Sequence, residues 1–392
     1  APRPGYGRLG GTADSARGLE TRLDRLIGHH DVGIAVGVGR RIVYRHDASR
    51  PRPPASNQKL LLTMALFDAL GPSHRLSTRA SAARLSDGVV VGDLWIDGRG
   101  DPTLDRRDLK GLVRKLKSRG VRRVAGRVRA DTSYFAHDWD APGWQPYVQD
   151  RFMPRPAALT VQPAAPGTTR RPESNVAAAL ATELRAAGIG VRGHGTGARP
   201  ADLRRLAGTR SASVRSLAAA MNRDSDNYVA EMLGKRLGAE VFGAPGTIAK
   251  GARAISRWAD GHGVRVLSHD ASGLSYTDRV APLSIVRLLD AGLGEPWGKW
   301  FRRSLPGAGE GTLAGRLAGL DVQAKTGTHF NGDSALSGWV GLSNGGRATF
   351  SILSNGMPKS VEDVVVGLIA QHARVPRVAP RPATVGGPAL PI

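Results

Sequence analysis

The sequence predicts an α/β protein of the α+β type, in which an antiparallel sheet flanked by helices is interrupted by a smaller inserted α/β domain. Strand patterns occur near the beginning of the 392-residue chain, at 32–46, and return near its end, at 323–354. Between them, short strand patterns surround one amphipathic helix over residues 77–134. Because strands and helices differ in the period of their apolar residues, these observations predict one sheet and one insertion.

The elements at the amino-terminal end follow from apolar spacing. Apolar residues at helical intervals predict a helix over 19–27, and residues 32–46 form two short strands around a turn at Gly39. Three prolines then precede an apolar run at 60–70, which a Gly-Pro pair ends. We interpret this run as a buried helix of about four turns.

The inserted domain is predicted from strands at 88–96 and 126–130 around a helix that carries Leu109 and Leu112 on one face and ends at Gly120. A proline-rich irregular segment follows it. The remaining expected elements are helices at 175–187, 214–237 and 361–373, and strands at 323–325, 334–342 and 348–354.

These elements divide the chain into three parts. We expect residues 1–76 and 176–375 to form one discontinuous domain that holds the sheet. Residues 77–175 form the expected inserted domain, and residues 376–392 form a proline-rich tail.

Composition excludes several classes of protein. The chain has no cysteine, which excludes disulfide frameworks, thiolate metal sites and cysteine nucleophiles. No apolar run reaches the roughly 18 residues of a membrane span. No spacing typical of a metal site or of a phosphate-binding loop occurs. We therefore expect no metal, no cofactor and no transmembrane segment.

A strongly positive charge predicts an anionic partner. The chain has 56 Lys and Arg against 33 Asp and Glu, a formal net charge of +23. The excess is densest between Arg99 and Arg129, where nine Arg and three Lys accompany three Asp. Nucleic acid is the less favoured partner, because the arginine pairs are dispersed and only 5% of residues are aromatic. We expect a basic face on the inserted domain.

The first candidate for chemistry lies at the start of the buried helix. Ser56 and Lys59 are one turn apart, so the lysine amine can reach the serine hydroxyl. Chance predicts about 0.6 Ser-x-x-Lys pairs in such a composition, so this motif alone is weak. A lysine in an otherwise apolar helix nevertheless needs a reason to be buried.

Two further motifs follow along the chain. Ser225-Asp226-Asn227 precedes a helical run, where a helix cap is the structural alternative. Lys325-Thr326-Gly327-Thr328 ends an apolar strand, and chance predicts only about 0.06 Lys-Thr-Gly matches. The three motifs in this order arise by chance in well below about 1% of such chains.

Together the motifs are the signature of penicillin-binding proteins and serine β-lactamases. Within that group the chain resembles the low-molecular-weight class C penicillin-binding proteins, the D-alanyl-D-alanine carboxypeptidase/endopeptidase family S13. Further blocks that carry the resemblance are residues 54–61, 98–104, 221–227, 272–275, 304–306, 311–316 and 324–328.

The resemblance implies a penicillin-binding transpeptidase-like catalytic domain, the fold shared with serine β-lactamases. It also implies that Ser56 is the nucleophile and Lys59 its general base. Ser225 would relay a proton to the leaving amine, and Asn227 would hold Lys59 and the substrate amide.

The strand motif would bind the substrate. Lys325 and the hydroxyls of Thr326 and Thr328, beside Gly327, would bind a terminal carboxylate. The backbone N–H groups of Ser56 and Thr328 would form the oxyanion hole.

The implied activity is that of a serine-type D-Ala-D-Ala carboxypeptidase, with or without endopeptidase activity, acting on peptidoglycan stem peptides. β-Lactam antibiotics would acylate Ser56 as covalent inhibitors, and anionic cell-wall polymers would meet the basic face. The resemblance also implies an exported protein, and because the chain begins with Ala1 rather than methionine, we expect any signal peptide not to be part of it. Its expected place is the cell wall, the periplasmic space or the medium.

The chain departs from the family pattern in its middle. The family usually carries two extra domains, one nested in the other, whereas only 169 positions separate Ser56 from Ser225 here. We expect the nested domain to be missing or reduced to the loop at 162–174.

Two alternatives stay open. A serine β-lactamase of class A would place a Glu and Asn pair for deacylation between the second and third motifs, and no Asn occurs between Asn227 and Asn331. A non-catalytic wall-binding relative would have lost a catalytic side chain, and all of them are present.

Overall fold

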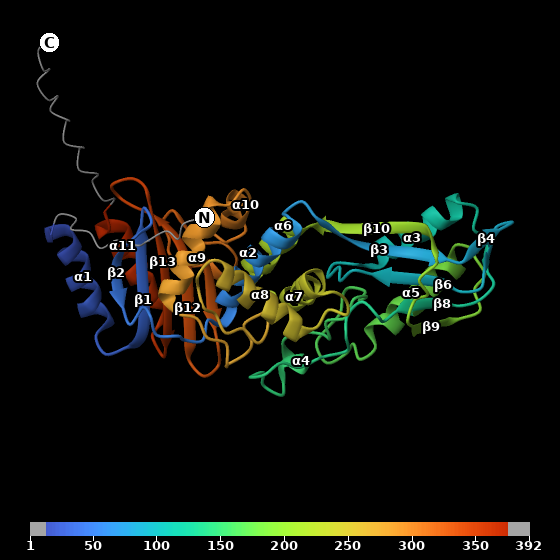
Figure 1. Cartoon of the computed structure of the whole chain (residues 1–392), viewed down its shortest axis with the longest axis horizontal. Helices are drawn as coiled ribbons and strands as arrows, with labels where there is room; N and C mark the ends of the chain where they lie inside the picture. Colours follow the sequence, from blue (N-terminus) through green and yellow to red (C-terminus); the bar gives the residue numbers. More distant parts are fainter. Residues whose placement is uncertain (1–12, 375–392) are drawn as a thin grey trace, which may run out of the picture.

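The computed structural model describes residues 13–374, so the tail expected at 376–392 lies outside the described part of the chain. Figure 1 shows an elongated molecule with a sheet near each end and helices between them. Strands from the two ends of the sequence share the first sheet, and residues from the middle of the chain form the second. The predicted combination of an antiparallel sheet and flanking helices is confirmed.

The first sheet contains β1 (Asp31–Val38), β2 (Arg41–His46), β11 (Val322–Thr328), β12 (Asp333–Gly341) and β13 (Arg347–Asn355). The strands are antiparallel in the order β11-β12-β13-β1-β2. Ile352 lies opposite both Ile34 and Leu336, so apolar side chains meet across three adjacent strands. One face is covered by α1 (Ala13–Ile27) and α11 (Lys359–His372), and the other by α9 (Pro282–Gly294).

The helical layer joins the two sheets. Its members are η1 (Ala55–Asn57), α2 (Gln58–Leu70), α6 (Val214–Asp224), α7 (Asn227–Phe242), α8 (Ile248–Gly261), α10 (Gly298–Arg303) and η2 (Gly311–Leu313), where η marks a 3-10 turn. Residues 58–67 of α2 are all buried, as the apolar run predicts, and α6, α7 and α8 pack around them. The start of α2 is therefore held at the centre of the layer.

The helix expected at 214–237 is two helices, because the chain turns at Ser225. This residue adopts a left-handed backbone conformation with φ of +58°, which ends α6. Asp226 then caps α7, and its carboxylate accepts the N–H of Val229 at 2.9 Å. The turn leaves Asn227 at the first position of α7, beside α2.

The second sheet has the order β10-β3-β6-β8-β9 and is covered by two helices. Its strands are β3 (Arg75–Ala82), β6 (Leu94–Gly98), β8 (Val128–Asp131), β9 (His194–Gly197) and β10 (Arg204–Ser213), and its helices are α3 (Arg106–Ser118) and α5 (Pro172–Ala186). A small separate sheet contains β4 (Arg84–Ser86), β5 (Val89–Val91) and β7 (Arg123–Val124). Helix α4 (Val148–Arg151) interrupts the irregular segment that follows.

The inserted part extends beyond the boundary expected at residue 175. Helix α5 buries Leu180 and Leu184 in the same core as Leu109 and Leu112 of α3, and β10 pairs with β3 along its length. Without β10, β3 would be an exposed sheet edge. These elements therefore belong with the second sheet rather than with residues 214–374. Residues 162–171 contain no helix or strand.

Candidate active site

Ser56 lies in η1, immediately before α2, and Lys59 lies in the first turn of that helix. The Lys59 Nζ atom is 2.9 Å from the Ser56 Oγ atom, so the one-turn spacing places the two groups within hydrogen-bond distance. Ser56 is partly exposed, whereas Lys59 is completely buried at 0% exposure. The hydroxyl can therefore meet a substrate while its lysine partner is shielded from water.

Lys59 has two further partners from distant parts of the chain. Its Nζ atom is 2.8 Å from the Asn227 Oδ1 atom and 2.6 Å from the Ser272 carbonyl oxygen. Burial lowers the pKa of Lys59 to about 8, although nearby carboxylates act in the opposite direction. A neutral amine has two N–H groups and one lone pair. When both N–H groups are donated to Asn227 and Ser272, the lone pair is left for the Ser56 hydroxyl proton.

Lys325 connects the third motif with the second. Its Nζ atom is 3.0 Å from the Ser225 Oγ atom and donates to the Thr326 carbonyl oxygen at 2.9 Å. Lys325 is completely buried, and this burial, together with the positive charge of Lys59, holds the pKa of Lys325 well below its usual range. The structure thus brings the three sequence motifs together in one polar cluster.

Strand β11 can approach the nucleophile because of one glycine. A Cβ atom at Gly327 would lie 3.0 Å from both the Ser56 backbone nitrogen and the Pro54 carbonyl oxygen. Such contacts are tighter than most side chains tolerate, so the residue at this position must lack a side chain. Gly327 therefore determines how close the strand lies to Ser56.

The two threonines flank Gly327 in different surroundings. Thr326 is buried, and its hydroxyl donates to the Thr312 Oγ1 atom at 2.8 Å. Thr328 is exposed, and its hydroxyl donates to the Gly327 carbonyl oxygen at 2.7 Å. Their roles in carboxylate binding and in an oxyanion hole stay predictions.

A loop at 270–275 completes the surroundings of Lys59. No role for this loop is predicted from the sequence. A Cβ atom at Gly273 would lie 1.9 Å from the Ala55 carbonyl oxygen, so the loop packs directly against η1. Asp270 holds the loop by accepting the Gly273 N–H at 2.7 Å and the Ser275 N–H at 2.9 Å. It also accepts the indole N–H of Trp144 at 2.7 Å.

Glu231 braces the same loop from helix α7. One carboxylate oxygen accepts the N–H groups of Ala271 at 3.0 Å and Ser272 at 2.7 Å. Burial, and then the charge of Asp270, raises the pKa of Glu231 above its usual range. Burial also raises the pKa of Asp278, which accepts the His269 N–H, well above its usual range. One signal was available in the sequence, because Glu231 interrupts an apolar helix as Lys59 does.

His329 links the end of β11 to this loop. Its Nε2 atom is 2.7 Å from the Gly273 carbonyl oxygen, and its Nδ1 atom is 3.1 Å from a carboxylate oxygen of Asp333. Both neighbours are hydrogen-bond acceptors, so each ring nitrogen of His329 faces an acceptor. The Tyr276 ring lies over the imidazole with a centroid distance of 4.4 Å. The imidazole therefore holds the two walls of the site together.

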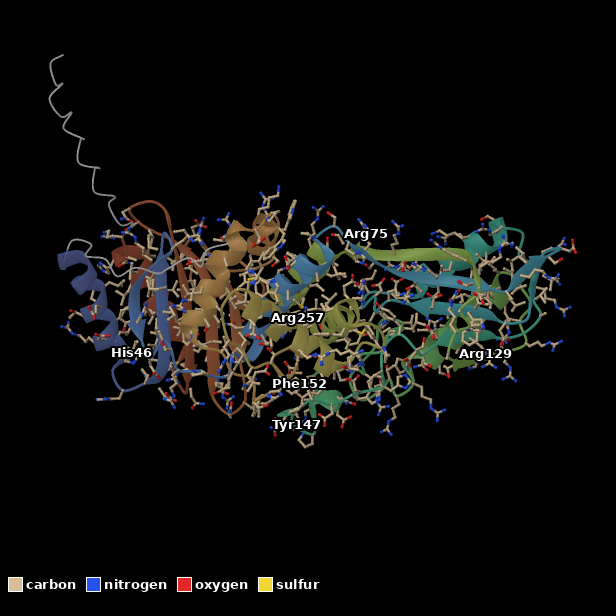
Figure 2. The ribbon with its side chains drawn as sticks, in the orientation of Figure 1. His46, Arg75, Arg129, Tyr147, Phe152 and Arg257 are labelled. Carbon is tan, nitrogen blue, oxygen red and sulfur yellow. The ribbon has the colours of Figure 1, made fainter. Side chains whose placement is uncertain are left out.

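A cavity of about 240 Å³ opens beside Ser56 and Asn227. One of its walls is aromatic, because Tyr147 and Phe152 lie 6.4 and 5.7 Å from Phe330 between ring centroids. Figure 2 shows Tyr147 and Phe152 on the side of the molecule where α4 lies. No spacing in the sequence predicts this wall, since its members come from segments far apart in the chain. Within residues 13–374, no group of three potential ligand side chains could hold a metal ion.

Comparisons with known proteins identify the family of this chain. The family model described as the D-Ala-D-Ala carboxypeptidase 3 (S13) family matches residues 27–171 and 165–372. A D-alanyl-D-alanine carboxypeptidase of Actinomadura sp. is 30% identical over 429 residues, covering 84% of this chain and 79% of the relative. A carboxypeptidase DacB of Mycolicibacterium smegmatis is 30% identical over 387 residues, covering 88% of this chain and 82% of the relative.

A solved structure has the same fold. Penicillin binding protein 4 of Haemophilus influenzae superposes with a TM-score of 0.77 at 22% identity, covering 86% of this chain and 93% of that one. The family model spans nearly all of the described residues, and the two carboxypeptidases align along more than four fifths of the sequence. On these matches, the chain belongs to the D-Ala-D-Ala carboxypeptidase 3 (S13) family.

Proposed function

We propose that this chain is a serine-type D-Ala-D-Ala carboxypeptidase whose nucleophile is Ser56. The observation that carries the proposal is the 2.9 Å contact between the Ser56 hydroxyl and the amine of Lys59, whose pKa burial lowers to about 8. At pH 7 about one Lys59 side chain in ten is then neutral. Such an amine accepts the hydroxyl proton while the oxygen attacks a carbonyl carbon.

During acylation Lys59 gains one proton and Lys325 loses one, so the total number of protons on the two lysines is unchanged. The Ser56 Oγ–H bond breaks, Oγ bonds to the carbonyl carbon of the penultimate D-Ala, and the proton passes to neutral Lys59. The peptide C–N bond then breaks, and the leaving amine takes a proton from the Ser225 hydroxyl. Lys325, whose Nζ atom is 3.0 Å from that hydroxyl, replaces the proton.

Deacylation follows the same route in reverse, with water in place of the amine. Water loses a proton through Ser225 to the now neutral Lys325, and its oxygen bonds to the acyl carbon. The ester bond to Ser56 breaks, and Oγ recovers its proton from Lys59. Each lysine then carries the charge with which it started, so the cycle is complete.

In this proposal, side chains of β11 bind the terminal carboxylate of the substrate. Burial and the charge of Lys59 disfavour the charged form of Lys325, and the carboxylate of a bound substrate offsets both effects, so Lys325 is charged in the substrate complex before acylation. The hydroxyls of Thr326 and Thr328 flank the strand glycine and supply hydrogen bonds. A substrate that ends in free D-Ala offers such a carboxylate, and so do penicillins.

The proposal includes the cellular setting. An enzyme that trims peptidoglycan stem peptides works outside the cytoplasmic membrane, in the wall, the periplasmic space or the medium. No helix of residues 13–374 has the length and apolar character to cross a membrane. Helix α3 buries its leucines and exposes six cations, which supports contact with anionic wall polymers; these are Arg106, Arg107, Lys110, Arg114, Lys115 and Lys117.

Labelling with a fluorescent penicillin tests the assignment. We expect the natural chain to take up one label per molecule and Ser56→Ala to take up none, because the acyl group has no oxygen to join. Ser118→Ala, which removes an exposed hydroxyl on α3, is the matched control and should label fully. Stoichiometric labelling of Ser56→Ala would overturn the assignment. Rapid loss of the label would instead indicate a β-lactamase.

A further inference from the structure

A second large cavity lies away from Ser56, where the second sheet meets the helical layer. Its volume is about 590 Å³, within the range typical of small-ligand sites, and five arginines line it. Figure 2 places one of them, Arg75, at this junction. The cavity shares no lining residue with the site around Ser56.

Strand β3 forms one wall of the cavity, because its side chains point alternately into the core and toward solvent. Leu76 and Thr78 are buried in the sheet, so Arg75, Ser77 and Arg79 lie on the opposite, solvent-facing side. Arg210 of β10 is paired in register with Ser77, which places it on the same side between the other two arginines. Three guanidinium groups from two strands therefore share one surface.

Two more arginines complete the lining, Arg99 at the end of β6 beside β3 and Arg236 on α7. The guanidinium of Arg99 lies over the Tyr134 ring, 4.3 Å from its centroid. Arg236 of α7 is only 7% exposed, and its Nη1 atom donates to Glu240 at 2.7 Å. The Nε atom of Arg236 is buried and has no hydrogen-bond partner among the described residues. A buried donor without a hydrogen-bond partner lowers the stability of the folded chain. An anionic ligand in the cavity would supply the acceptor that this N–H group lacks.

Few carboxylates balance these charges. In the described part of the chain, Arg75, Arg79, Arg99 and Arg210 form no ion pair, and the carboxylate of Asp97 is 3.4 Å from Arg199 instead. Asp97 is the one carboxylate of residues 13–374 that attracts Arg79 and Arg99, and Arg199 shares it, so an anion in the cavity lowers the remaining repulsion among the guanidinium groups. Guanidinium groups match phosphoryl oxygens with paired hydrogen bonds.

We propose that this arginine pocket binds a phosphoryl group carried by an anionic cell-wall polymer. The pocket disfavours nucleic acid, because the one Tyr, Phe or Trp ring in its lining, that of Tyr134, lies between Arg99 and Phe135 and offers no free face to a base. Only the choice of a wall polymer as the source of the phosphoryl group rests on the proposed function.

The position of the pocket gives this binding a structural role. Its arginines come from both sides of the junction, with Arg75, Arg79 and Arg210 on the second sheet and Arg236 on α7. The same α7 begins with Asn227, a partner of Lys59. A bound phosphoryl group therefore bridges the inserted part and a helix of the active site.

Binding of soluble poly(glycerol phosphate), measured calorimetrically at fixed salt, tests the proposal. Arg79→Gln with Arg210→Gln should weaken binding at least about tenfold, because charge-assisted hydrogen bonds are lost. Arg22→Gln with Arg25→Gln is the matched control, since it removes two exposed cations from α1 at the far end of the molecule (Figure 1). The control should change binding less than about twofold.

Each outcome decides a separate question. Displacement of the polymer by pyrophosphate supports a phosphoryl site, whereas binding of pyrophosphate without polymer overturns the polymer as source. Equal losses in the pocket and control variants overturn the pocket itself. Single-stranded DNA that binds as tightly as the polymer, with the same loss in Arg79→Gln with Arg210→Gln, overturns the choice of ligand class. Fluorescent penicillin labelling of all variants reports the proposed function independently.

Discussion

Lys59 is held by partners that lie 168 and 213 positions further along the chain, Asn227 and the Ser272 carbonyl. The one-turn spacing alone predicts its contact with Ser56, because that contact is local to the helix. The Ser272 contact could not be predicted in this way, since a backbone oxygen has no residue-type signal. Its position depends on how the loop at 270–275 packs against η1.

Acylation should slow as the pH falls below about 8. Burial lowers the pKa of Lys59 to about 8, so the fraction of neutral amine decreases about tenfold per pH unit below that value. The measurement is the second-order rate constant of penicillin acylation between pH 5.5 and 9. Lys59→Ala should be at least about 10²-fold slower and lose this dependence. A flat profile for the natural chain would contradict Lys59 as the base.

Lys325→Ala should distinguish substrates by their charge. Lys325 is buried beside Ser225, where we propose that the terminal carboxylate of a substrate becomes its counter-ion. We expect turnover of peptides that end in free D-Ala to fall by at least about tenfold more than hydrolysis of a carboxylate-free thioester. Equal losses on both substrates would show that Lys325 has a structural role only.

Among the elements, the break between α6 and α7 shows where sequence patterns fail. A continuous helical period over 214–237 predicts one helix, and the left-handed conformation of Ser225 divides it. The boundary at 175 fails for a related reason, because α5 and β10 have ordinary local patterns. Their assignment depends on contacts with α3 and β3, which no local window contains.

The loop at 270–275 depends on Glu231, and its replacement should show how. Glu231→Ala leaves the N–H groups of Ala271 and Ser272 without an acceptor, so the free energy of unfolding should fall by about 2 kcal/mol or more. Acylation should slow as well, since Ser272 positions Lys59. Glu231→Gln keeps a carbonyl acceptor, so it should retain most of the stability and most of the acylation rate. Urea unfolding measures the first and penicillin labelling the second.

The pH dependence of stability separates the natural chain from Glu231→Gln. In the folded chain the pKa of Glu231 lies above its ordinary 4.5, so the protonated form is favoured by folding. The stability from this group is complete below pH 4.5 and decreases as the pH rises through the folded pKa. Glu231→Gln has no such proton, so its stability should fall less over that interval. Identical pH profiles would contradict a raised pKa.

At the scale of the whole molecule, the basic surface should make wall binding sensitive to salt. Retention on isolated walls should fall steeply between 0.15 and 1 M salt, since screening shortens from about 8 to about 3 Å. Reversing the charges of Arg107, Lys110, Arg114 and Lys117, four of the exposed cations of α3, should weaken retention while leaving penicillin labelling at Ser56 unchanged. Retention that is independent of salt, or that survives the reversals, would show that these charges have no role in wall binding.

The order of the strands in the first sheet has a consequence for the time course of folding. Strand β1 lies between β2, which ends at His46, and β13, which begins at Arg347. During synthesis the hairpin of β1 and β2 is therefore only marginally stable until β13, near the end of the chain, has been made and pairs with β1. The second sheet has its own core within residues 80–207 and can fold earlier. Because η1 packs against β11, the serine becomes reactive only when synthesis is nearly complete.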